Sequence, residues 1–418
     1  MKVLAALSGG VDSAVAAAMA VEAGHDVTGV HMVLSQAAQS CASRVRGCSS
    51  AQDTEDARRA AEIIGIPYEV WDLSDEFEDR VISDFLSQYR AGHTPNPCVR
   101  CNEFVKFREL AERARELGFD AVCTGHYARI LEGPEGPELH RGLDEAKDQS
   151  YVLAVIGPEE LKRVVLPLGA APSKAWVRGE AERRGLGVSN KPDSFDICFI
   201  PDGDTAAFLR QNLGERPGQI IDAEGNVVGE HRGSYQFTVG QRKGLNLGRP
   251  AKDGKPRYVV STDPKTNTVL VGPSALLTVT RLTANAPVYY EAPTPVSAAH
   301  PSPVSAAHCV DEDQQPQRLV VDVAAQQAFG STMEGRGLNE VPDDVFTAQI
   351  RAHGTPSVVT AIRATKDGLE VDLAEPIRGV AAGQALVLYK GSRVVAEATL
   401  VSASHSNSAA GGTQDSLQ

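Results

Sequence analysis

The residues with the clearest chemical potential form the loop Ser8–Ser13, with the sequence SGGVDS. The loop follows an apolar run, Val3–Leu7, and enters an alanine-rich segment, Asp12–Ala23, so we expect it to join a buried strand to a helix. Glycines at such a turn let the backbone approach phosphate oxygens, and the helix N-terminus adds N–H donors and the positive end of its dipole. The pattern therefore predicts a nucleotide phosphate site, with a tight turn that binds nothing as the competing interpretation.

The loop differs from the two commonest nucleotide motifs. It lacks the lysine of GxxxxGK[ST], which disfavours a Walker-type loop, and it lacks GxGxxG, which disfavours a dinucleotide-binding fold. SGGxDS between a strand and a helix resembles the PP-loop of the N-type ATP pyrophosphatases. That resemblance implies that ATP is cleaved between its α and β phosphates and that AMP is left on a substrate oxygen.

Two residues outside the loop are expected to lie beside the nucleotide. Ligands of parallel sheets bind beyond the carboxyl ends of the strands. Met32 lies near the end of a predicted strand, Asp26–Leu34, and Gly125 directly follows another, Asp120–Thr124. We expect Met32 to contact adenine, and its alternative role is packing in the core.

Seven cysteines are the next candidates for chemistry. An odd number in a chain with no recognisable secretory leader argues against a disulfide framework and favours reduced thiols with chemical or metal-binding roles. Cys98 and Cys101 lie in TPNPCVRCN, a loop stiffened by two prolines that we expect to end at a helix N-terminus. A cysteine at a helix start, with Arg100 beside it, should have a lowered thiol pKa and more thiolate.

The spacing of Cys98 and Cys101 also has a metal-binding interpretation. It is the common spacing of half a zinc site, although the sequence has no second CxxC or HxxxH to complete one. Cys41 and Cys48 could join the pair to hold an iron–sulfur cluster. We favour thiol chemistry and expect no resident metal at these cysteines.

Cys198 lies in SFDICFIP, at an expected domain junction, where substrate clefts often form. By itself, a cysteine between Ile197 and Phe199 is more often a buried structural residue. Its combination with an ATP-activating loop and Cys101 favours a different role. AMP on a carbonyl oxygen is a good leaving group, a persulfide sulfur is a suitable nucleophile, and a second thiol can release the sulfur by disulfide exchange.

The elements that must position these residues form three expected domains. Domain 1–201 begins with short apolar runs that alternate with helical patterns, which predicts βαβ units and a parallel sheet. Turn pairs between short β-type runs predict a small β-rich middle domain over 202–273, and a β-barrel is expected over 274–401. The other expected elements are the helices Asp53–Ile64, Glu76–Arg90 and Glu103–Leu117 and the strands Ile66–Leu73, Val358–Ala364, Leu369–Leu373, Ala385–Tyr389 and Val394–Leu400.

Two segments lie outside the expected barrel core. The six residues PVSAAH occur twice, at Pro295–His300 and Pro303–His308, and an acidic, glutamine-rich stretch follows. We expect 291–317 to be a disordered insertion and 402–418 a disordered tail. The formal net charge of −13 is unusual for a protein that binds RNA, but many of the acids lie in and after this insertion. Since no apolar run approaches the ~20 residues of a membrane helix, we expect a cytoplasmic protein.

Six segments together resemble the bacterial tRNA-specific 2-thiouridylases and occur in that family's order. They are Ser8–Ser13, Pro95–Asn102 (PNPCVRCN), Thr124–Arg129 (TGHYAR), Lys147–Leu153 (KDQSYVL), Ser194–Pro201 (SFDICFIP) and Phe237–Leu245 (FTVGQRKGL). The resemblance implies a PP-loop domain, a small middle β domain and a translation-factor-like β-barrel. It also implies an enzyme that thiolates the wobble uridine of tRNAs for glutamate, glutamine and lysine. ATP and Mg²⁺ are the implied cofactors, and a cysteine desulfurase or sulfur-relay protein is the implied source of a persulfide.

The resemblance also implies the site residue by residue. Cys198 matches the cysteine that carries the persulfide, and Cys101 matches the nucleophile that attacks it. The matching ATP contacts are Ala6, Leu7, Ser8, Gly9, Gly10, Val11, Asp12, Ser13, Met32 and Gly125. The matching tRNA contacts are Asn96, Pro97, Cys98, His126, Lys147, Asp148, Gln149 and, in the barrel, Gln384.

Two departures from the family pattern limit this transfer. Many family members have aspartate where this chain has Cys98, so an acid–base role for that aspartate does not carry over. The insertion at 291–317 obscures how the barrel aligns with the family. The assignment of Arg351 as a tRNA contact therefore rests only on its position in the sequence. Arg242 and Lys243 either contact RNA phosphate or are simply exposed.

Two other functions compete with RNA thiolation. Another PP-loop synthetase, which adenylates a carboxylate, would need ATP but neither Cys101 nor Cys198. A non-catalytic RNA-binding relative would have no need of an intact phosphate loop, whereas Asp12 and both glycines are present here.

Overall fold

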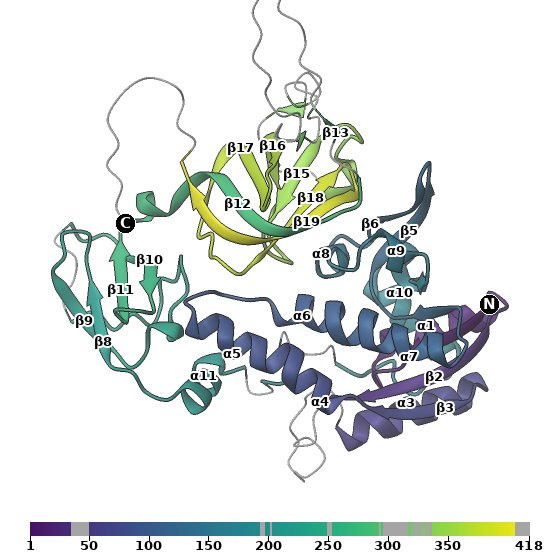
Figure 1. Cartoon of the computed structure of the whole chain (residues 1–418). Coiled ribbons are helices and arrows are strands. Elements are labelled where there is room, and N and C mark those ends of the chain that lie inside the picture. Colours follow the sequence, from purple (N-terminus) through teal and green to yellow (C-terminus); the bar gives the residue numbers. More distant parts are fainter. Residues whose placement is uncertain are drawn as a thin grey trace, which may run out of the picture.

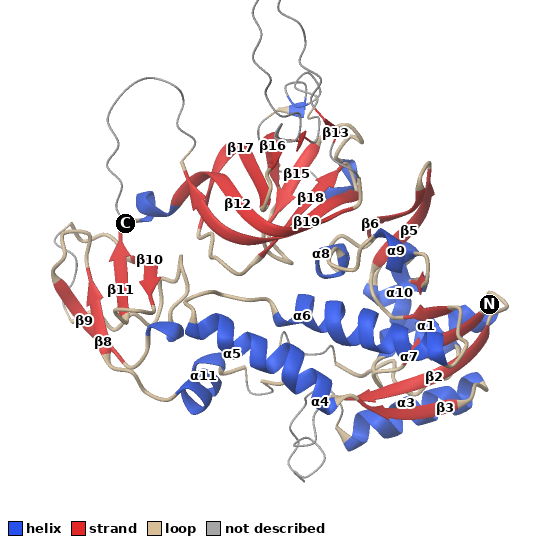
Figure 2. Cartoon of the chain, in the orientation of Figure 1, coloured by secondary structure: helices blue, strands red, loops and turns tan. Residues whose placement is uncertain are grey.

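The computed structural model describes residues 1–34, 50–192, 197–200, 203–248, 253–291 and 337–405, together with short pieces between 294 and 333. These residues form an α/β domain, a small β domain and a β-barrel, which follow one another along the chain (Figure 1). Figure 2 shows that helices are concentrated in the first domain and strands in the other two. The three-part fold class expected from the sequence is confirmed.

The first domain is built on a five-stranded parallel sheet with the order β3-β2-β1-β4-β7. β1 is central, and alternate residues of it enter two hydrophobic clusters, one on each face of the sheet. This burial on both faces explains the continuous apolar run at the start of the sequence. The strands are β1 (Lys2–Ala6), β2 (Asp26–Val33), β3 (Tyr68–Asp72), β4 (Ala121–Cys123) and β7 (Val164–Val165).

Helices cover both faces of this sheet. α1, α3 and α10 share one cluster, where the mainly alanine side chains of α1 allow it to approach the strands closely. α7 covers the other face through Leu110 and Ala114. These helices are α1 (Val11–Glu22), α3 (Ala51–Ile64), α7 (Leu110–Glu116) and α10 (Lys174–Arg183).

Two long helical segments flank the loop of residues 91–96, which directly precedes Cys98. Each contains a stretch of wider, π-type turns, a feature that often marks functional sites. The first consists of α4 (Ser74–Phe77), η1 (Glu78–Ile82) and α5 (Ser83–Arg90), and the second of α6 (Pro97–Arg100), η2 (Cys101–Glu109) and α7. Short helices follow at α8 (Ser150–Leu153), α9 (Pro158–Leu161) and η3 (Pro167–Ala170).

A hairpin of the first domain extends the barrel sheet, which the sequence analysis did not anticipate. β5 (Ala128–Gly133) and β6 (Gly136–Arg141) pair antiparallel with each other. β6 then pairs with the last barrel strand, where His140 lies opposite Arg393. The first domain and the barrel are therefore joined by strand pairing.

The middle domain is a four-stranded sheet with the order β10-β11-β8-β9 around a small apolar core. It begins with a helix, α11, that the sequence analysis did not assign and that Asp204 caps through the N–H of Ala207. α11 packs against α5 of the first domain. The elements are α11 (Thr205–Leu213), β8 (Gly218–Ile221), β9 (Val227–His231), η4 (Ser234–Gln236), β10 (Tyr258–Asp263) and β11 (Thr268–Gly272).

The C-terminal unit is a closed barrel, because its first strand pairs with its last as well as with β17. The strands are β12 (Thr278–Tyr289), β15 (Phe346–Gln349), β16 (Ser357–Ala364), β17 (Gly368–Arg378), β18 (Ala385–Lys390) and β19 (Arg393–Ser404). η5 (Ser274–Leu277) precedes the barrel and η7 (Leu338–Glu340) precedes β15. β19 continues past the boundary at 401 that the sequence suggested.

The two segments expected to be disordered fall mostly outside the described residues. Within 291–317 the structure describes only Glu291, Thr294–Pro295 (β13) and Gln317, and β13 pairs with β14 (Gln317–Arg318). The tail is described as far as His405. Across the described part of the chain, none of the helices is both long and apolar enough to cross a membrane.

Candidate functional site

The loop Ser8–Ser13 joins β1 to α1 at the carboxyl edge of the parallel sheet. Gly9 has a φ of +77°, and a Cβ there would lie 2.2 Å from the carbonyl oxygen of Asp53. Gly10 is the N-cap of α1, and no side chain among the described residues caps this end. The first N–H groups of α1 are therefore available to an anion, as a phosphate site requires.

Hydrogen bonds inside the loop give it a defined shape. The hydroxyl of Ser13 accepts from Ser8 N at 3.1 Å and donates to Gly10 O at 3.2 Å. The carbonyl of Leu7 lies 2.8 Å from Nδ1 of the buried His31. Gly125 lies directly against the loop, since a Cβ there would be 2.7 Å from Ser13 N. The structure thus brings Gly125 to the phosphate loop.

Three residues that the sequence analysis missed complete the surroundings of the loop. Tyr127 donates its hydroxyl to Asp12 Oδ1 at 2.7 Å, and Lys174 Nζ lies 2.6 Å from Asp12 Oδ2. Lys191 donates to Gly9 O at 2.9 Å and pairs with Asp53 at 2.7 Å. Lys174 and Lys191 are far from the loop in sequence, so no local pattern could have identified them.

The ammonium of Lys191 stays protonated in this position. Burial lowers its pKa, but hydrogen bonds to Asp53 and Asp56 outweigh burial, and the net pKa is raised. A cation held against Gly9 O and a second one at Asp12 place two positive charges beside the loop. Three carboxylates, Asp12, Asp53 and Asp56, balance these two ammonium groups, so the phosphate site rests on the N–H groups at the start of α1 and not on an excess of positive charge.

Cys101 and Cys198 pack against the same hydrophobic cluster, although they are far apart in sequence. Cys101 is buried in that cluster together with Leu34, which follows β2, and residues of α4, η1 and η2. Cys198 is half-buried at the edge of the cluster. Phe199 anchors the Cys198 turn through edge-on contacts with Phe77 and Phe85, at ring-centre distances of 5.8 Å and 5.3 Å. The fold therefore brings the two predicted reactive cysteines into one neighbourhood.

Met32 connects this cysteine cluster to the sheet. Its side chain is half-buried and packs against both the cluster of Cys101 and the cluster of Leu4. Both interpretations offered by the sequence, core packing and a position beside the nucleotide, are compatible with that location. Met32 therefore lies on the face of the sheet that α7 covers and reaches from there to the cluster of Cys101.

The helix that carries Cys101 begins earlier than the sequence predicted. The expected start at Glu103 is wrong, because Pro97 occupies the first helical position and Asn96 accepts a hydrogen bond from Cys98 N at 3.0 Å. Cys98 therefore lies in the first turn and Cys101 lies one turn later. The helix-start argument for thiolate formation, made for the pair, now applies to Cys98.

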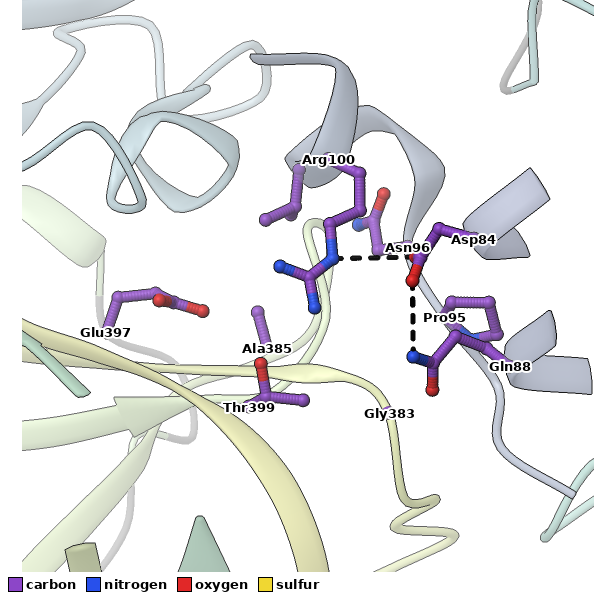
Figure 3. A pocket seen from close by; sticks show the side chains of 10 residues that line it. Asp84, Gln88, Pro95, Asn96, Arg100, Gly383, Ala385, Glu397 and Thr399 are labelled. Carbon is purple, nitrogen blue, oxygen red and sulfur yellow. Dashed lines mark hydrogen bonds and ion pairs between the residues drawn. The ribbon is translucent and has the colours of Figure 1, made fainter. Parts of the chain in front are cut away.

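Arg100 also differs from its expected role beside the cysteines. Its guanidinium pairs with Glu103 at 2.7 Å and with Asp84 at 3.6 Å, so two carboxylates compensate its charge. Figure 3 shows the side chain directed toward a pocket between the helix and the barrel. The residues that line this pocket are Asp84, Gln88, Pro95, Asn96, Val99, Arg100, Gly383, Ala385, Glu397 and Thr399.

The barrel contacts the loop between α5 and α6 through the residues that directly precede β18. Thr94 N donates to Ala382 O at 2.8 Å, and a Cβ on Gly383 would lie 2.8 Å from His93 Cβ. Gln384 is the next residue, and its carbonyl accepts from Leu400 N at 2.8 Å. The residues on either side of Gln384, Gly383 and Ala385, line the same pocket as Asn96, and the role of Gln384 as a tRNA contact stays a prediction.

The buried Glu397 in this pocket makes stability depend on pH. Burial raises its pKa to about 8, Glu103 raises it further and Arg100 opposes this effect. An unfolded glutamate titrates near pH 4.3. Between about pH 4.3 and 8 the folded state holds a proton that the unfolded state has lost, so this group contributes less stability as pH rises.

Glu397→Gln should therefore raise Tm relative to wild type, and the difference should grow from pH 5 to pH 8 and then level off. Differential scanning calorimetry at matched salt measures this difference. Glu132→Gln, at an exposed position of β5, is the control and should change Tm much less over the same pH range. A Glu397→Gln difference that stays constant over this range would show that Glu397 is ionised in the folded protein.

Two of the expected tRNA contacts are inside the protein. Asp148 accepts from Gly142 N, Ser150 N and Arg141 Nη1 at 2.9, 3.0 and 3.0 Å, and it is 8% exposed. His126 is also buried, with Nδ1 2.8 Å from the hydroxyl of Thr124. Burial and the nearby Lys106 lower the pKa of His126 well below its usual range, so the ring is neutral. Both side chains are therefore mostly covered by protein, and their contact with RNA stays a prediction.

The remaining tRNA candidates are accessible to different degrees. Lys147 and Gln149 are half-buried, whereas Arg242, Lys243 and Arg351 are exposed. Arg351 donates to Gly379 O, and Gly379 lies against Gly240 of the middle domain. The exposed bases of the middle domain and the barrel thus lie on either side of one domain contact.

The metal-cluster alternative is not tested at its decisive residues. Cys41 and Cys48 lie outside the described residues. In the remaining chain, as far as it is described, no three His, Cys, Asp or Glu side chains are grouped to hold a metal ion.

Family models match the chain in three consecutive parts. They are described as the tRNA methyl transferase HUP domain over residues 1–202, the tRNA methyl transferase PRC-barrel domain over 206–273 and the aminomethyltransferase beta-barrel domain over 340–399. Their order agrees with the three folded parts described above.

Curated relatives match the chain over nearly its whole length. The tRNA-specific 2-thiouridylase MnmA of Beutenbergia cavernae is 51% identical and covers 96% of this chain and 94% of the relative. The proteins of that name from Kocuria rhizophila and Streptomyces avermitilis are 50% and 51% identical, each over 96% of this chain and over 97% and 94% of their own. A solved 4-thiouridine synthetase–RNA complex with bound ATP covers 50% of each chain at 19% identity and a TM-score of 0.33, a similarity too low to support an argument.

Proposed function

The chain belongs to the tRNA-specific 2-thiouridylase family, and we propose that it uses ATP to activate the C2 carbonyl of the wobble uridine in tRNA and replaces that oxygen with sulfur. The observation that carries this proposal is that one domain holds both an uncapped phosphate loop and two cysteines that pack, together with Met32, against one cluster. An ATP site alone would suit many synthetases. A pair of cysteines packed against the same cluster favours sulfur chemistry.

The phosphate loop supports adenylation of the uridine oxygen. The proposed ATP contacts are Ala6–Ser13, Met32 and Gly125, with Lys191 and Lys174 as added cations. Attack by the uridine O2 on the α phosphate would form an O–P bond and release pyrophosphate. Asp12 would hold Mg²⁺ through carboxylate oxygens that also accept hydrogen bonds from Tyr127 and Lys174, and the ion would supply positive charge to the phosphates.

The cysteines support sulfur transfer after adenylation. We assign the persulfide to Cys198, loaded by a cysteine desulfurase or a sulfur-relay protein, and the resolving thiol to Cys101. Sulfur then bonds to C2 as the C2–O bond to AMP breaks. Release of the sulfur from Cys198 needs no metal, because the Cys101 thiolate can displace it from the persulfide directly.

We propose that the tRNA is bound between the first domain and the barrel, with the anticodon arm of tRNAs for glutamate, glutamine and lysine as the target. Asn96, Pro97 and Cys98 would face the everted base. Lys147 and Gln149 would contact the tRNA elsewhere, and Gln384 would lie near the anticodon. Asp148 also fixes the segment beside Lys147 by accepting from Gly142 N and Ser150 N, and His126 remains a proposed tRNA contact. A cytoplasmic location is consistent with reduced thiols and access to tRNA.

The direct test measures products of the purified full-length protein with ATP, tRNA and a persulfide donor. We expect AMP and pyrophosphate in equal amounts, and 2-thiouridine in the RNA by nucleoside mass spectrometry. The same assay should fail with Asp12→Ala. AMP formation without any thiouridine would favour another PP-loop synthetase, and binding of tRNA without AMP would favour a non-catalytic relative.

The exposed bases predict a salt dependence of tRNA binding. Arg242 and Lys243 should contact phosphates. The double variant Arg242→Gln with Lys243→Gln should therefore reduce the slope of log Kd against log salt by the amount expected for the loss of about two phosphate contacts. Filter binding between about 50 and 300 mM salt measures the slope. Lys366→Gln with Lys255→Gln, which removes two charges elsewhere, is the matched control. An unchanged slope in the first variant would mean that Arg242 and Lys243 are merely exposed.

A further inference from the structure

The segment Asp144–Gln149 is connected by two independent routes to the carboxylate of Asp12. This segment contains Lys147 and Gln149, which we propose as tRNA contacts, whereas Asp12 belongs to the phosphate loop. Every residue of the segment is more than 130 positions from Asp12 in the sequence. The contact of Tyr127 with Asp12 spans 115 positions. The connection is therefore a property of the tertiary fold.

The first route passes through Tyr127. Gln149 clamps the backbone of Tyr127, because its Oε1 accepts from Tyr127 N at 3.0 Å and its N–H donates to Tyr127 O at 2.8 Å. The hydroxyl of Tyr127 then donates to Asp12 Oδ1 at 2.7 Å. The ring is 3% exposed and belongs to the core under α1, so it transmits a displacement of its backbone to the hydroxyl.

The second route passes through Lys174. Asp144 Oδ2 accepts from the backbone N–H of Lys174, the first residue of α10, at 3.0 Å. The ammonium of Lys174 lies 2.6 Å from Asp12 Oδ2, and its side chain is 15% exposed. Each oxygen of the Asp12 carboxylate is thus held by a group whose position depends on the Asp144–Gln149 segment.

The segment itself is anchored at the junction of the first domain and the barrel. Asp148 accepts from Arg141 Nη1 at 3.0 Å, and the same nitrogen donates to Gln349 of β15 at 2.9 Å. The Arg141 guanidinium lies 3.5 Å from the ring centre of Tyr389, in β18. An RNA that rests on both domains would act on this anchor, and through it on the two routes.

We propose that Tyr127 and Lys174 are positioning residues that couple tRNA binding at Asp144–Gln149 to the orientation of the Asp12 carboxylate, so that ATP is used only when tRNA is bound. The inference rests on the proposed function, because it takes Lys147 and Gln149 as RNA contacts and Asp12 as part of the ATP site. Neither residue needs to touch the RNA. The physical gain is that ATP is not hydrolysed to AMP without a uridine to accept the adenylate.

Such coupling must be reciprocal, which gives a test by binding alone. We would measure the Kd of α,β-methylene-ATP with and without a glutamate tRNA transcript, and the Kd of the transcript with and without the analogue. This analogue cannot be cleaved between its α and β phosphates. In the full-length wild-type protein each ligand should tighten the other by the same factor, on the order of 5- to 150-fold.

Tyr127→Phe keeps the buried ring and removes only the hydroxyl. It should leave the Kd of the transcript alone within about twofold and reduce the coupling factor to near one. Lys174→Met should weaken the analogue in both states and also reduce the coupling factor. Tyr68→Phe is the matched control, since it removes a phenol hydroxyl that donates to Thr54 O at 3.0 Å in the same domain.

Each outcome decides between coupling and a merely structural role. Wild-type coupling retained in Tyr127→Phe, with or without a lower Tm, would overturn the inference, and so would a coupling factor of one in the wild type. Formation of 2-thiouridine by the wild type is measured separately. If thiouridine forms but the coupling is absent, only the inference fails, whereas absence of thiouridine means that the proposed function fails.

Discussion

Cys198→Ser is expected to lower the rate of 2-thiouridine formation by at least about a thousandfold, while AMP formation from ATP persists. A serine hydroxyl cannot carry a persulfide, so the adenylated uridine would have no sulfur donor. The phosphate loop does not include Cys198, and the substitution should leave ATP binding unchanged. Product analysis by nucleoside mass spectrometry, with parallel measurement of AMP, checks both halves of this expectation.

The order of the sulfur steps is tested by Cys101→Ser in a single turnover. If the Cys101 thiolate first attacks the Cys198 persulfide, it displaces sulfide, forms a Cys101–Cys198 disulfide and requires reductant for each cycle. No product should then form in the variant. If the persulfide attacks C2 directly and AMP leaves, one turnover should proceed and leave an enzyme–RNA disulfide.

Cys123→Ala is the control for both cysteine variants. Burial raises the pKa of the Cys123 thiol to about 12, so this thiol does not react at neutral pH. The variant should keep thiolation close to the wild-type rate. Peptide mapping that finds Cys98 bridged to Cys198, in place of Cys101, would show that the resolving residue is Cys98, which lies in the first helical turn.

Gly9→Ala should reduce AMP formation by at least about a hundredfold, because the phosphate loop has no room for a methyl group. The Cβ would lie 2.2 Å from the carbonyl oxygen of Asp53, and the N-terminal turn of α3 would have to move. Lys191, which holds both Gly9 O and Asp53, would be displaced with it. AMP formation and Tm are measured on the same preparation.

Two other glycines separate the loop geometry from general strain. Gly24→Ala introduces the same left-handed strain, at a φ of +82°, with nothing within 4 Å of the new methyl group, and should keep full activity. Gly10 has a φ of −93°, and its new Cβ would meet only Ser8 Oγ at 3.4 Å, so Gly10→Ala should fold normally. The variant should still bind ATP about tenfold or more weakly, because the added methyl group would block the approach of a phosphate to the loop. Normal ATP affinity in Gly10→Ala would mean that phosphate lies elsewhere.

Short-range patterns in the sequence determined the architecture and the chemical centres. The SGGVDS loop was predicted because strand, glycine turn and helix are contiguous, and the parallel sheet followed from the alternation of apolar runs. Cys101 and Cys198 were singled out by their surroundings in sequence, and the family resemblance assigned their roles. Curated relatives with 50–51% sequence identity confirm that the chain belongs to this family.

Only the tertiary structure decided what surrounds those centres. The groups on Asp12 and Gly9, namely Tyr127, Lys174 and Lys191, come from 115 to 182 residues away, and no periodicity records such contacts. Burial of Asp148 and His126 likewise depends on Arg141 and on packing from distant elements, which a polar motif in the sequence cannot reveal. Local sequence specifies backbone geometry and residue type, whereas charge compensation and exposure are set by the neighbours that folding brings together.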